Sequence, residues 1–329
     1  EGTRGAAPWG VLGAPAMVES AAVEPAQKRR KEFEEQGGSV YAGTNAVPRT
    51  GNPGRVLHLG LADGELANRV VVVGSPARAR LLAENLEPEA PGAPLFSLES
   101  DRGFLTITGM LAGTRVSVVS IGMGLPMMDF FVREGRAVTR GPLVVARFGT
   151  CGVLRESVAV GSVSVAKEGS ICVQRNYAAF ADSGDTENTK HASYHISDVC
   201  PPDAELTAAV TRELEEALGP DMVATGVNVT ADSFYGSQGR VDPSFRDANG
   251  GLVEEVLSRH PRALSCEMES FQLLHLARCC VPQGSMRAAA AVVNVANRTT
   301  GAVVGEEALR NAERKGGAAI VRAVATLPL

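Results

Sequence analysis

Short apolar runs alternate with segments of helical composition through most of the chain. Val70–Val73 is a β-branched run that ends at Gly74, and residues 77–86 have a helical composition. The same order of strand, glycine turn and helix returns at residues 115–138 and begins again at residues 143–152. Three such units predict an α/β domain.

Further strands and helices continue this alternation towards the C-terminus. We expect strands at residues 162–166, 226–231 and 288–294, and helices at residues 203–218, 250–259, 268–279 and 306–325. Alternating strands and helices are typical of a sheet with helices on both faces. We therefore expect a single α/β domain over residues 51–329, with a mixed, mostly parallel central sheet and a long loop over residues 178–202.

Residues 1–50 differ from the rest of the chain, because they are rich in Gly, Ala, Pro and charged residues. We expect a flexible tail with one helix at residues 24–36 and a turn-rich run at residues 37–55. Met17 is a candidate native first residue, and the residues before it would then derive from expression. The folded domain is expected to begin near residue 51.

Composition and charge limit the classes of function. The 329 residues are 44% hydrophobic and 21% charged, which is typical of a globular protein. The net charge of -5 and the lack of a long basic run argue against a nucleic-acid partner. We see no membrane-spanning segment or signal peptide, so we expect a cytoplasmic protein with no membrane partner. Any anionic ligand must then be bound by a few placed arginines.

Two segments that follow predicted strands could bind an anion. In GSPARAR, Gly74 lets the backbone approach a ligand, while the helix N-terminus and Arg78 offer hydrogen-bond donors. In RFGTCG, the charge of Arg147 in an apolar run requires an anion or a carboxylate, and Thr150 adds a hydroxyl and an amide. The alternatives are ordinary turn chemistry for the first segment and a structural ion pair for the second.

A third segment, TADSFYGSQGR, could bind a pyrimidine base. Phe234 offers an aromatic face for stacking, Gln238 can bond O2 and N3 of the base, and Arg240 can stabilise the negative charge that the base acquires as it leaves. A polar surface loop with one core aromatic residue is the alternative.

The segment CEMES is expected to open the helix at residues 268–279 and could bind a ribose. Glu269 can accept hydrogen bonds from the vicinal hydroxyls, and Met268 can pack against the sugar ring. Carboxylates in a first helical turn could instead complement the helix dipole.

Taken in order, eight segments resemble the uridine phosphorylases of the nucleoside phosphorylase family. These segments are VLHLGL, VVVGSPARA, SDRGF, GMGLP, RFGTCG, DSFYGSQGR, CEMES and ANRTTG, and they extend from about residue 55 to the C-terminus. The resemblance implies phosphorolysis of uridine to uracil and ribose 1-phosphate. Inorganic phosphate would be a co-substrate, and no cofactor is expected.

The resemblance also implies which residues form the site. The phosphate-binding residues would be Gly74, Arg78, Arg102, Arg147 and Thr150; the ribose-binding residues would be His58, Glu267, Met268 and Glu269; and the base-binding residues would be Phe234, Gln238, Arg240 and Arg298. Arg147, Gln238 and Arg240 would be catalytic. His58 and Arg102 would reach into the site of a partner subunit, so at least a homodimer is expected.

The departures from the family pattern bear on the substrate and on metals. Purine enzymes of the family typically carry a Ser-Asp pair where this chain has residues 295–298, and the missing acid favours a pyrimidine. Gly103 replaces a cation-binding glutamate of bacterial relatives, so no metal is expected. The alternatives are a purine nucleoside phosphorylase or nucleosidase, and a catalytically silent nucleoside-binding protein. A dehydrogenase is the least favoured alternative, because GMGLP lacks the GxGxxG pattern.

Overall fold

The computed structural model describes residues 47–51, 54–181 and 192–329, which belong to one compact unit. The helix predicted at residues 24–36 and most of the expected tail lie outside these ranges. Strands β1 (Arg49–Thr50) and β2 (Arg55–Val56) pair in antiparallel fashion. Arg49 donates hydrogen bonds to Asp63 and to the main-chain oxygen of Ala137. The packed part of the chain therefore begins before residue 51.

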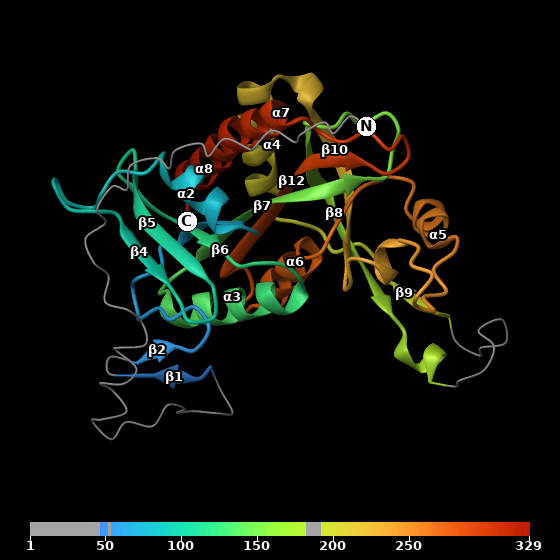
Figure 1. The fold of residues 1–329 in the computed structure, drawn as a ribbon. Helices are drawn as coiled ribbons and strands as arrows, with labels where there is room; N and C mark the ends of the chain where they lie inside the picture. Colours follow the sequence, from blue (N-terminus) through green and yellow to red (C-terminus); the bar gives the residue numbers. More distant parts are fainter. Residues whose placement is uncertain (1–46, 52–53, 182–191) are drawn as a thin grey trace, which may run out of the picture. The chain divides into compact units, whose positions relative to one another are not determined.

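A central sheet of ten strands organises the described residues (Figure 1). Its strands are β3 (Arg69–Val73), β4 (Phe96–Glu99), β5 (Leu105–Leu111), β6 (Thr114–Ser120), β7 (Leu143–Val153), β8 (Val163–Arg175), β9 (Tyr194–Ile196), β10 (Val223–Ala231), β11 (Ala263–Glu267) and β12 (Met286–Asn297). The strand order is β11-β10-β8-β12-β7-β3-β6-β5-β4, and β9 pairs with β8. Pairings around β3, β7 and β10 are mostly parallel, whereas β4–β5–β6 and β8–β12 are antiparallel. This mixed sheet confirms the predicted fold class.

The sheet divides along one edge of β7. On that edge, β3 pairs with the first half of β7 as far as Arg147, and β11 pairs with its end at Gly152 and Val153. Strand β12 follows the opposite edge over the whole length of β7. Among the described residues, the edge at 148–151 therefore has no strand partner between β3 and β11. The carboxyl ends of these two strands meet at this opening.

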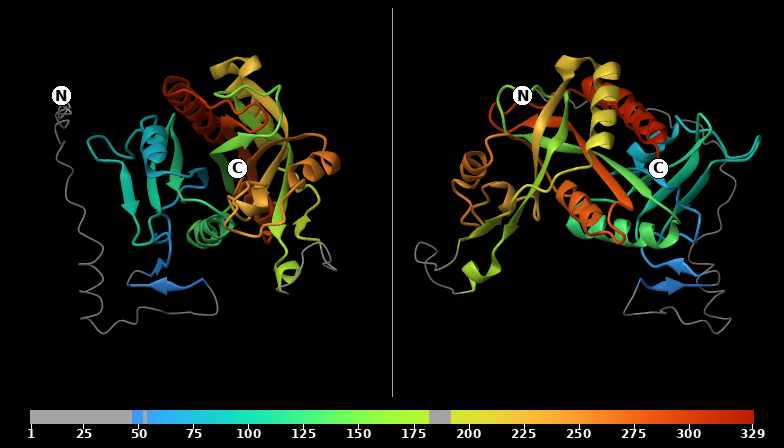
Figure 2. Two further views of the ribbon diagram at one scale, coloured as in Figure 1. Left: turned by 45° about the vertical axis from the view of Figure 1, so that its right-hand side comes forward. Right: turned by 180° about the vertical axis from the view of Figure 1, so that it is seen from behind.

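Helices cover both faces of the sheet (Figures 1 and 2). They are α2 (Pro76–Ala83), α3 (Leu125–Val138), α4 (Ala204–Leu218), α5 (Leu252–Arg259), α6 (Ser270–Cys279), α7 (Glu306–Asn311) and α8 (Gly317–Thr326). Because side chains alternate along a strand, Val71 and Val73 of β3 pack with α2, α4 and α8, while Val70 and Val72 pack with α3 and α6. The β-branched run thus contributes to two cores, one on each face.

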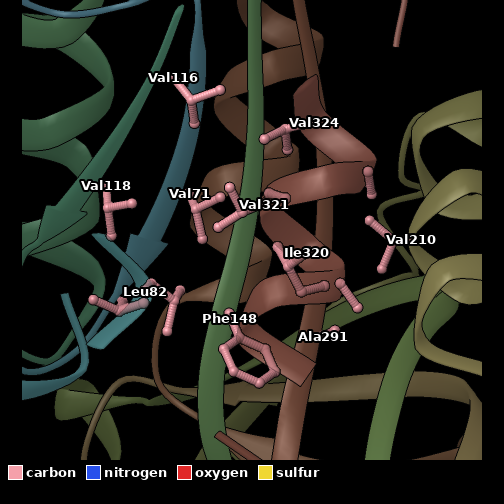
Figure 3. Close-up of a cluster of buried hydrophobic side chains, with 14 of the residues drawn as sticks. Val71, Leu82, Val116, Val118, Phe148, Val210, Ala291, Ile320, Val321 and Val324 are labelled. Carbon is pink, nitrogen blue, oxygen red and sulfur yellow. The ribbon is translucent and has the colours of Figure 1, made fainter. Parts of the chain in front are cut away.

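Figure 3 shows the core on the side of α2, α4 and α8, where Phe148 packs near Ile320 and Ala291. A Cβ atom on Gly316 would lie 3.0 Å from Phe148 Cζ, so glycine allows the C-terminal helix to approach β7. The helix predicted over residues 306–325 forms, but it is divided by a π turn at Ala312–Gly316 between α7 and α8.

The helix predicted at residues 268–279 forms, but it begins two residues later than predicted, so CEMES contains the end of β11 as well as the start of α6. Cys266 and Glu267 are the last residues of β11, and α6 begins at Ser270. The carboxylate of Glu267 accepts hydrogen bonds from the main-chain N–H groups of Glu269, the N-cap of α6, and of Ser270, its first residue. Glu267 therefore lies at the end of β11 and binds the N–H groups at the start of α6, while Glu269 is the N-cap of α6.

Candidate active site

Arg147 lies at the centre of the opening beside β7. Its side chain is only 4% exposed, and its Nε atom donates to Glu267 at 3.1 Å while Nη2 donates to Glu269. Glu267 and Glu269 thus form the structural ion pair that was the alternative interpretation of RFGTCG. Its Nη1 atom is also buried, and it has no hydrogen-bond partner in the part of the chain that the structure describes. One edge of the guanidinium is thus held by carboxylates, and one nitrogen remains to bind an anion.

Glycines give two arginines of the site the space they occupy. A Cβ atom on Gly149 would lie 2.8 Å from Arg147 Nη2, and one on Gly152 would lie 3.0 Å from Arg298 Cδ. Both distances are too short for a normal contact, and both guanidinium groups are fixed by hydrogen bonds. The packing of Arg147 and Arg298 therefore requires glycine at positions 149 and 152 of RFGTCG.

Glu267 is fixed by protein groups from several elements. Its carboxylate accepts hydrogen bonds from Asn228 at 2.8 Å, from Thr230 at 2.6 Å and from Arg147, in addition to the two main-chain N–H groups at the start of α6. The side chain is 2% exposed. A ribose hydroxyl could bind Glu267 only by displacing one of these donors, so the described contacts make it a holder of Arg147 and of the start of α6.

Glu269 has fewer protein partners than Glu267. It accepts hydrogen bonds from Arg147 and from the main-chain N–H of Gly124, which is the N-cap of α3. The N-terminus of α3, preceded by GMGLP, thus faces a carboxylate. Met268 is partly buried between the two glutamates.

The two carboxylates differ in their acidity. Burial raises the pKa of Glu269 to about 7, and the charge of Glu267 adds to this effect against the attraction of Arg147. Burial also opposes the ionisation of Glu267, but Arg147 and the hydrogen bonds from Thr230 and Asn228 lower its pKa below the ordinary value. Glu267 is therefore the ionised partner of Arg147, and Glu269 can exchange a proton near neutral pH.

The remaining phosphate candidates lie around the end of β3. The main-chain oxygen of Gly74 accepts a hydrogen bond from Gly122 at 3.1 Å. Helix α2 follows, with Ser75 as its N-cap and Arg78 in its first turn. Thr150 is half-buried on the unpaired edge of β7. The structure thus brings Gly74, at the end of β3, close to the middle of β7, which carries Arg147 and Thr150.

Arg78 is already engaged by a residue that the sequence did not suggest. Glu313 of the π turn accepts hydrogen bonds from Arg78 Nε at 2.9 Å and from Nη2 at 2.7 Å. The two side chains are 10% and 19% exposed. The sequence did not indicate this pair, because the two residues are more than two hundred positions apart.

The base candidates lie on the segment after β10, which includes a 3₁₀ turn at Gly236–Gln238. Arg240 stacks on Phe234, with Cζ 4.0 Å from the ring centroid, and Phe234 is 46% exposed. Gln238 is buried, yet its carboxamide has no hydrogen-bond partner among the described residues. The segment therefore presents a cation, an aromatic face and a free amide.

Arg298 joins this segment to the rest of the site. It donates hydrogen bonds to the main-chain oxygens of Gln238 and Gly239. A small cavity lies between Gln238, Arg298, Cys266 and apolar residues that include Leu154 and Val229. Partial burial and the neighbouring charge of Arg298 lower the pKa of Arg240. The base segment therefore lies against the end of β11, next to the carboxylates.

His58 is held in the turn after β2. Its ring stacks on Phe130 with centroids 3.9 Å apart, and its Nδ1 atom lies 2.6 Å from Glu134 Oε1. Glu134 also accepts hydrogen bonds from the main-chain N–H groups of His58 and Leu59. Within the described residues, the Nε2 atom of His58 has no hydrogen-bond partner, because Glu134 contacts the other ring nitrogen. The sequence did not suggest Glu134, because a glutamate within an amphipathic helix is ordinarily exposed.

Arg102 lies apart from the phosphate candidates of its own chain. It occupies the turn between β4 and β5, next to the row of paired residues Glu99, Leu105, Ser120 and Val73. The turn joins β4 and β5, which lie three and two strand spacings from β3, so it is roughly 10–14 Å from the end of β3. The structure therefore does not bring Arg102 to Gly74 within one chain.

Two further structural features concern metals and membranes. Within residues 47–51, 54–181 and 192–329, no group of three or more His, Cys, Asp or Glu side chains is arranged to hold a metal ion. In the same ranges, no helix combines the length and apolar character that crossing a bilayer requires.

Comparisons with known proteins agree on a family. A family model described as the phosphorylase superfamily matches residues 68–326. The chain is similar to a structure from a study of uridine phosphorylases of the oomycete Phytophthora capsici, with 42% identity, a TM-score of 0.81 and coverage of 88% of this chain and 100% of that one. A nucleoside phosphorylase structure from Trypanosoma brucei, 22% identical with a TM-score of 0.67 over 84% of this chain and 99% of that one, shares the fold.

Curated relatives carry a different substrate in their names. The DeoD-type purine nucleoside phosphorylase of Brevibacillus brevis is 32% identical over 183 residues, which are 54% of this chain and 67% of that protein. The corresponding protein of Anoxybacillus flavithermus is 32% identical over 221 residues, which are 67% and 80% of the two chains.

Proposed function

The chain belongs to the phosphorylase superfamily, and within it we propose that the protein is a uridine phosphorylase. It splits uridine with inorganic phosphate into uracil and ribose 1-phosphate. The proposal rests on three groups of residues around the opening beside β7, one for each part of the reactants.

Phosphate binds where the end of β3 lies beside the middle of β7. The unpaired Nη1 atom of Arg147 donates to it, together with Arg78, the hydroxyl of Thr150 and the main chain near Gly74. Because Arg147 is buried and Glu267 holds its Nε atom, the donor is fixed before phosphate arrives. A fixed donor costs little reorganisation on binding.

The ribose lies between the phosphate and the base. Glu269 accepts hydrogen bonds from its vicinal hydroxyls, and Met268 packs against the ring. Glu267 takes part by holding Arg147 and the main chain of Glu269, since its own oxygens are occupied. His58, oriented by Glu134, contributes from a partner subunit to the 5′-hydroxyl.

The base segment stabilises the leaving group. A phosphate oxygen forms a bond to C1′ as the bond from C1′ to N1 of uracil breaks, and its electron pair moves into the pyrimidine ring. Arg240 and the carboxamide of Gln238 bind the anionic ring, and Phe234 stacks on it. The uracil anion then takes a proton from solvent. Catalysis comes mainly from positioning and charge stabilisation.

The observation that carries the choice of a pyrimidine is the charge around Arg240. In the described part of the chain, Arg240 stacks on Phe234 and forms no ion pair with a carboxylate, and the nearby charge of Arg298 lowers its pKa. Such a site favours an anion, and residues 295–298 contain no acid that could protonate a purine ring. The similarity at 42% identity to a structure from a study of uridine phosphorylases supports the same substrate.

A purine nucleoside phosphorylase is the second candidate, because the curated relatives at about 30% identity are named as such. The experiment that separates the two measures cleavage of uridine and of inosine, each with and without phosphate. The proposed protein cleaves uridine in a phosphate-dependent way and cleaves inosine poorly.

The proposed active unit is at least a homodimer. By the spacing of strands, the turn that carries Arg102 lies roughly 10–14 Å from the end of β3 in its own chain, so Arg102 would complete the anion site of a second copy. Gel filtration with light scattering tests this assembly, and a monomer that remains fully active would contradict it.

A further inference from the structure

Two ion pairs join the π turn at Ala312–Gly316 to helix α2. Glu313 pairs with Arg78 near the start of α2, and the next residue, Arg314, pairs with Glu84 at its end at 3.0 Å. A π turn inserts a residue into a helix and so changes the direction of the side chains around it, and such turns are frequent at functional sites. Here the turn directs two consecutive side chains at the same helix.

The two pairs differ in their exposure to solvent. Arg78 and Glu313 are 10% and 19% exposed, whereas Arg314 and Glu84 are 66% and 57% exposed. An exposed pair contributes little to stability, whereas a desolvated pair is costly to form. Stability alone is therefore a weak reason for the buried pair.

The geometry of the buried pair leaves part of Arg78 available. A single oxygen of Glu313 accepts from Nε and Nη2, which form one edge of the guanidinium. The main-chain N–H of Arg78 donates to Ser75, the N-cap of α2, at 3.2 Å. Both ends of the arginine are thus fixed, and Nη1 has no partner among the described residues.

We propose that Glu313 is a positioning residue for phosphate binding, which acts by holding the guanidinium of Arg78 towards the anion site. The inference rests on the proposed function, in which Arg78 binds phosphate. An arginine side chain has many rotamers, and fixing it in the empty protein removes that entropic cost from the binding step. The negative charge of Glu313 works in the opposite direction, because it repels phosphate. We expect the orienting effect to dominate, because Glu313 holds the Nε–Nη2 edge of Arg78 by two hydrogen bonds. Removal of the carboxylate then raises the KM for phosphate, whereas dominant repulsion would make the same change lower it.

The test is steady-state kinetics with phosphate and uridine varied in turn, on the parent protein and on the Glu313→Ala and Glu313→Gln variants. We expect Glu313→Ala to raise the KM for phosphate roughly tenfold, because it loses a charge-assisted hydrogen-bonded pair. The KM for uridine and kcat should stay within about threefold. Glu313→Gln keeps an acceptor of the same shape and should recover part of the loss. Arg314→Ala, which removes the exposed pair between the same two elements, is the matched control and should behave as the parent.

Three results would overturn the positioning role. An unchanged KM for phosphate would make the pair purely structural, and a lower one would make Glu313 a competitor of phosphate. A parallel rise in both KM values, with the same fall in thermal midpoint as Arg314→Ala, would indicate general loosening. Failure of the proposed function is separate, because the parent itself would then show no phosphate-dependent cleavage. Calorimetric titration of the same variants with phosphate alone would still test the inference.

Discussion

Arg147 donates from Nη2 to Glu269 at the point where the sheet divides between β3 and β11. The proposed phosphate-binding arginine and the proposed ribose-binding carboxylate are therefore direct partners inside the protein. Glu267 holds the same guanidinium through Nε, so the two binding regions share one buried ionic network. A change at any member should affect the others.

Gly149→Ala tests the space that this network requires. The added Cβ would lie 2.8 Å from Arg147 Nη2, and the guanidinium cannot move freely because two carboxylates hold it. We expect a loss of stability of about 1–3 kcal/mol, as for other overpacked sites, together with a higher KM for phosphate. Thermal unfolding and phosphate kinetics measure the two effects. Gly305→Ala is the control, since its Cβ would meet nothing within 4 Å; equal behaviour of the two variants would contradict the prediction.

Glu269 should make the stability of the protein depend on pH. Its pKa is raised from 4.5 to about 7, so the folded protein binds this proton more tightly than the unfolded chain between those values. The stabilisation is complete below about pH 4.5 and is lost as the pH rises to about 7, with a slope of at most about 1.4 kcal/mol per pH unit. As the pH rises through this range, the thermal midpoint of the parent should fall more than that of Glu269→Gln. Parallel curves for the two proteins would show that Glu269 does not titrate there.

Arg240→Ala should remove most of the turnover. The variant loses the cation that stacks on Phe234 and stabilises the leaving base, which typically costs about 3–4 kcal/mol, or roughly 10²- to 10³-fold in kcat. Uridine turnover at saturating phosphate measures the loss. Arg259→Ala, which removes an exposed pair with Glu255, is the control and should retain parental activity. Turnover by Arg240→Ala within a few fold of the parent would argue against the assigned base site.

Arg298→Met should separate base binding from phosphate binding. Methionine keeps an apolar stem beside Gly152 but cannot donate to the main-chain oxygens of Gln238 and Gly239. We expect kcat/KM for uridine to fall by roughly tenfold or more, because two hydrogen bonds that place the base segment are lost. The KM for phosphate should change less than about twofold. An equal effect on both substrates would mean that Arg298 supports the whole site.

Much of the fold follows from local patterns in the sequence. Val70–Val73 and the helix after it are found where the apolar run and Gly74 predict them, because glycine and β-branched residues act on their own backbone. The strands β4, β5, β9 and β11 of the central sheet were not predicted, since none has a continuous apolar run and β4, β9 and β11 are also short. The division of the sheet at β7 depends on β11, so the sequence could not indicate the opening.

The candidate site shows the same limit. RFGTCG and CEMES indicate charged side chains in apolar surroundings, but their pairing across the sheet depends on the fold. Glu313 and Glu134 have no local signal, because each becomes significant only through a partner that lies far away in the sequence. Residue types near strand ends suggested the ligand-binding groups, whereas the carboxylates that orient them required the structure.

The most direct test of the central claim is the release of uracil from uridine, followed by ultraviolet absorbance, with and without inorganic phosphate and with inosine in parallel. The proposed function predicts cleavage of uridine that requires phosphate, with little or no cleavage of inosine. Efficient phosphate-dependent cleavage of inosine in place of uridine would assign the protein to the purine branch, and cleavage that does not need phosphate would contradict the proposed anion site.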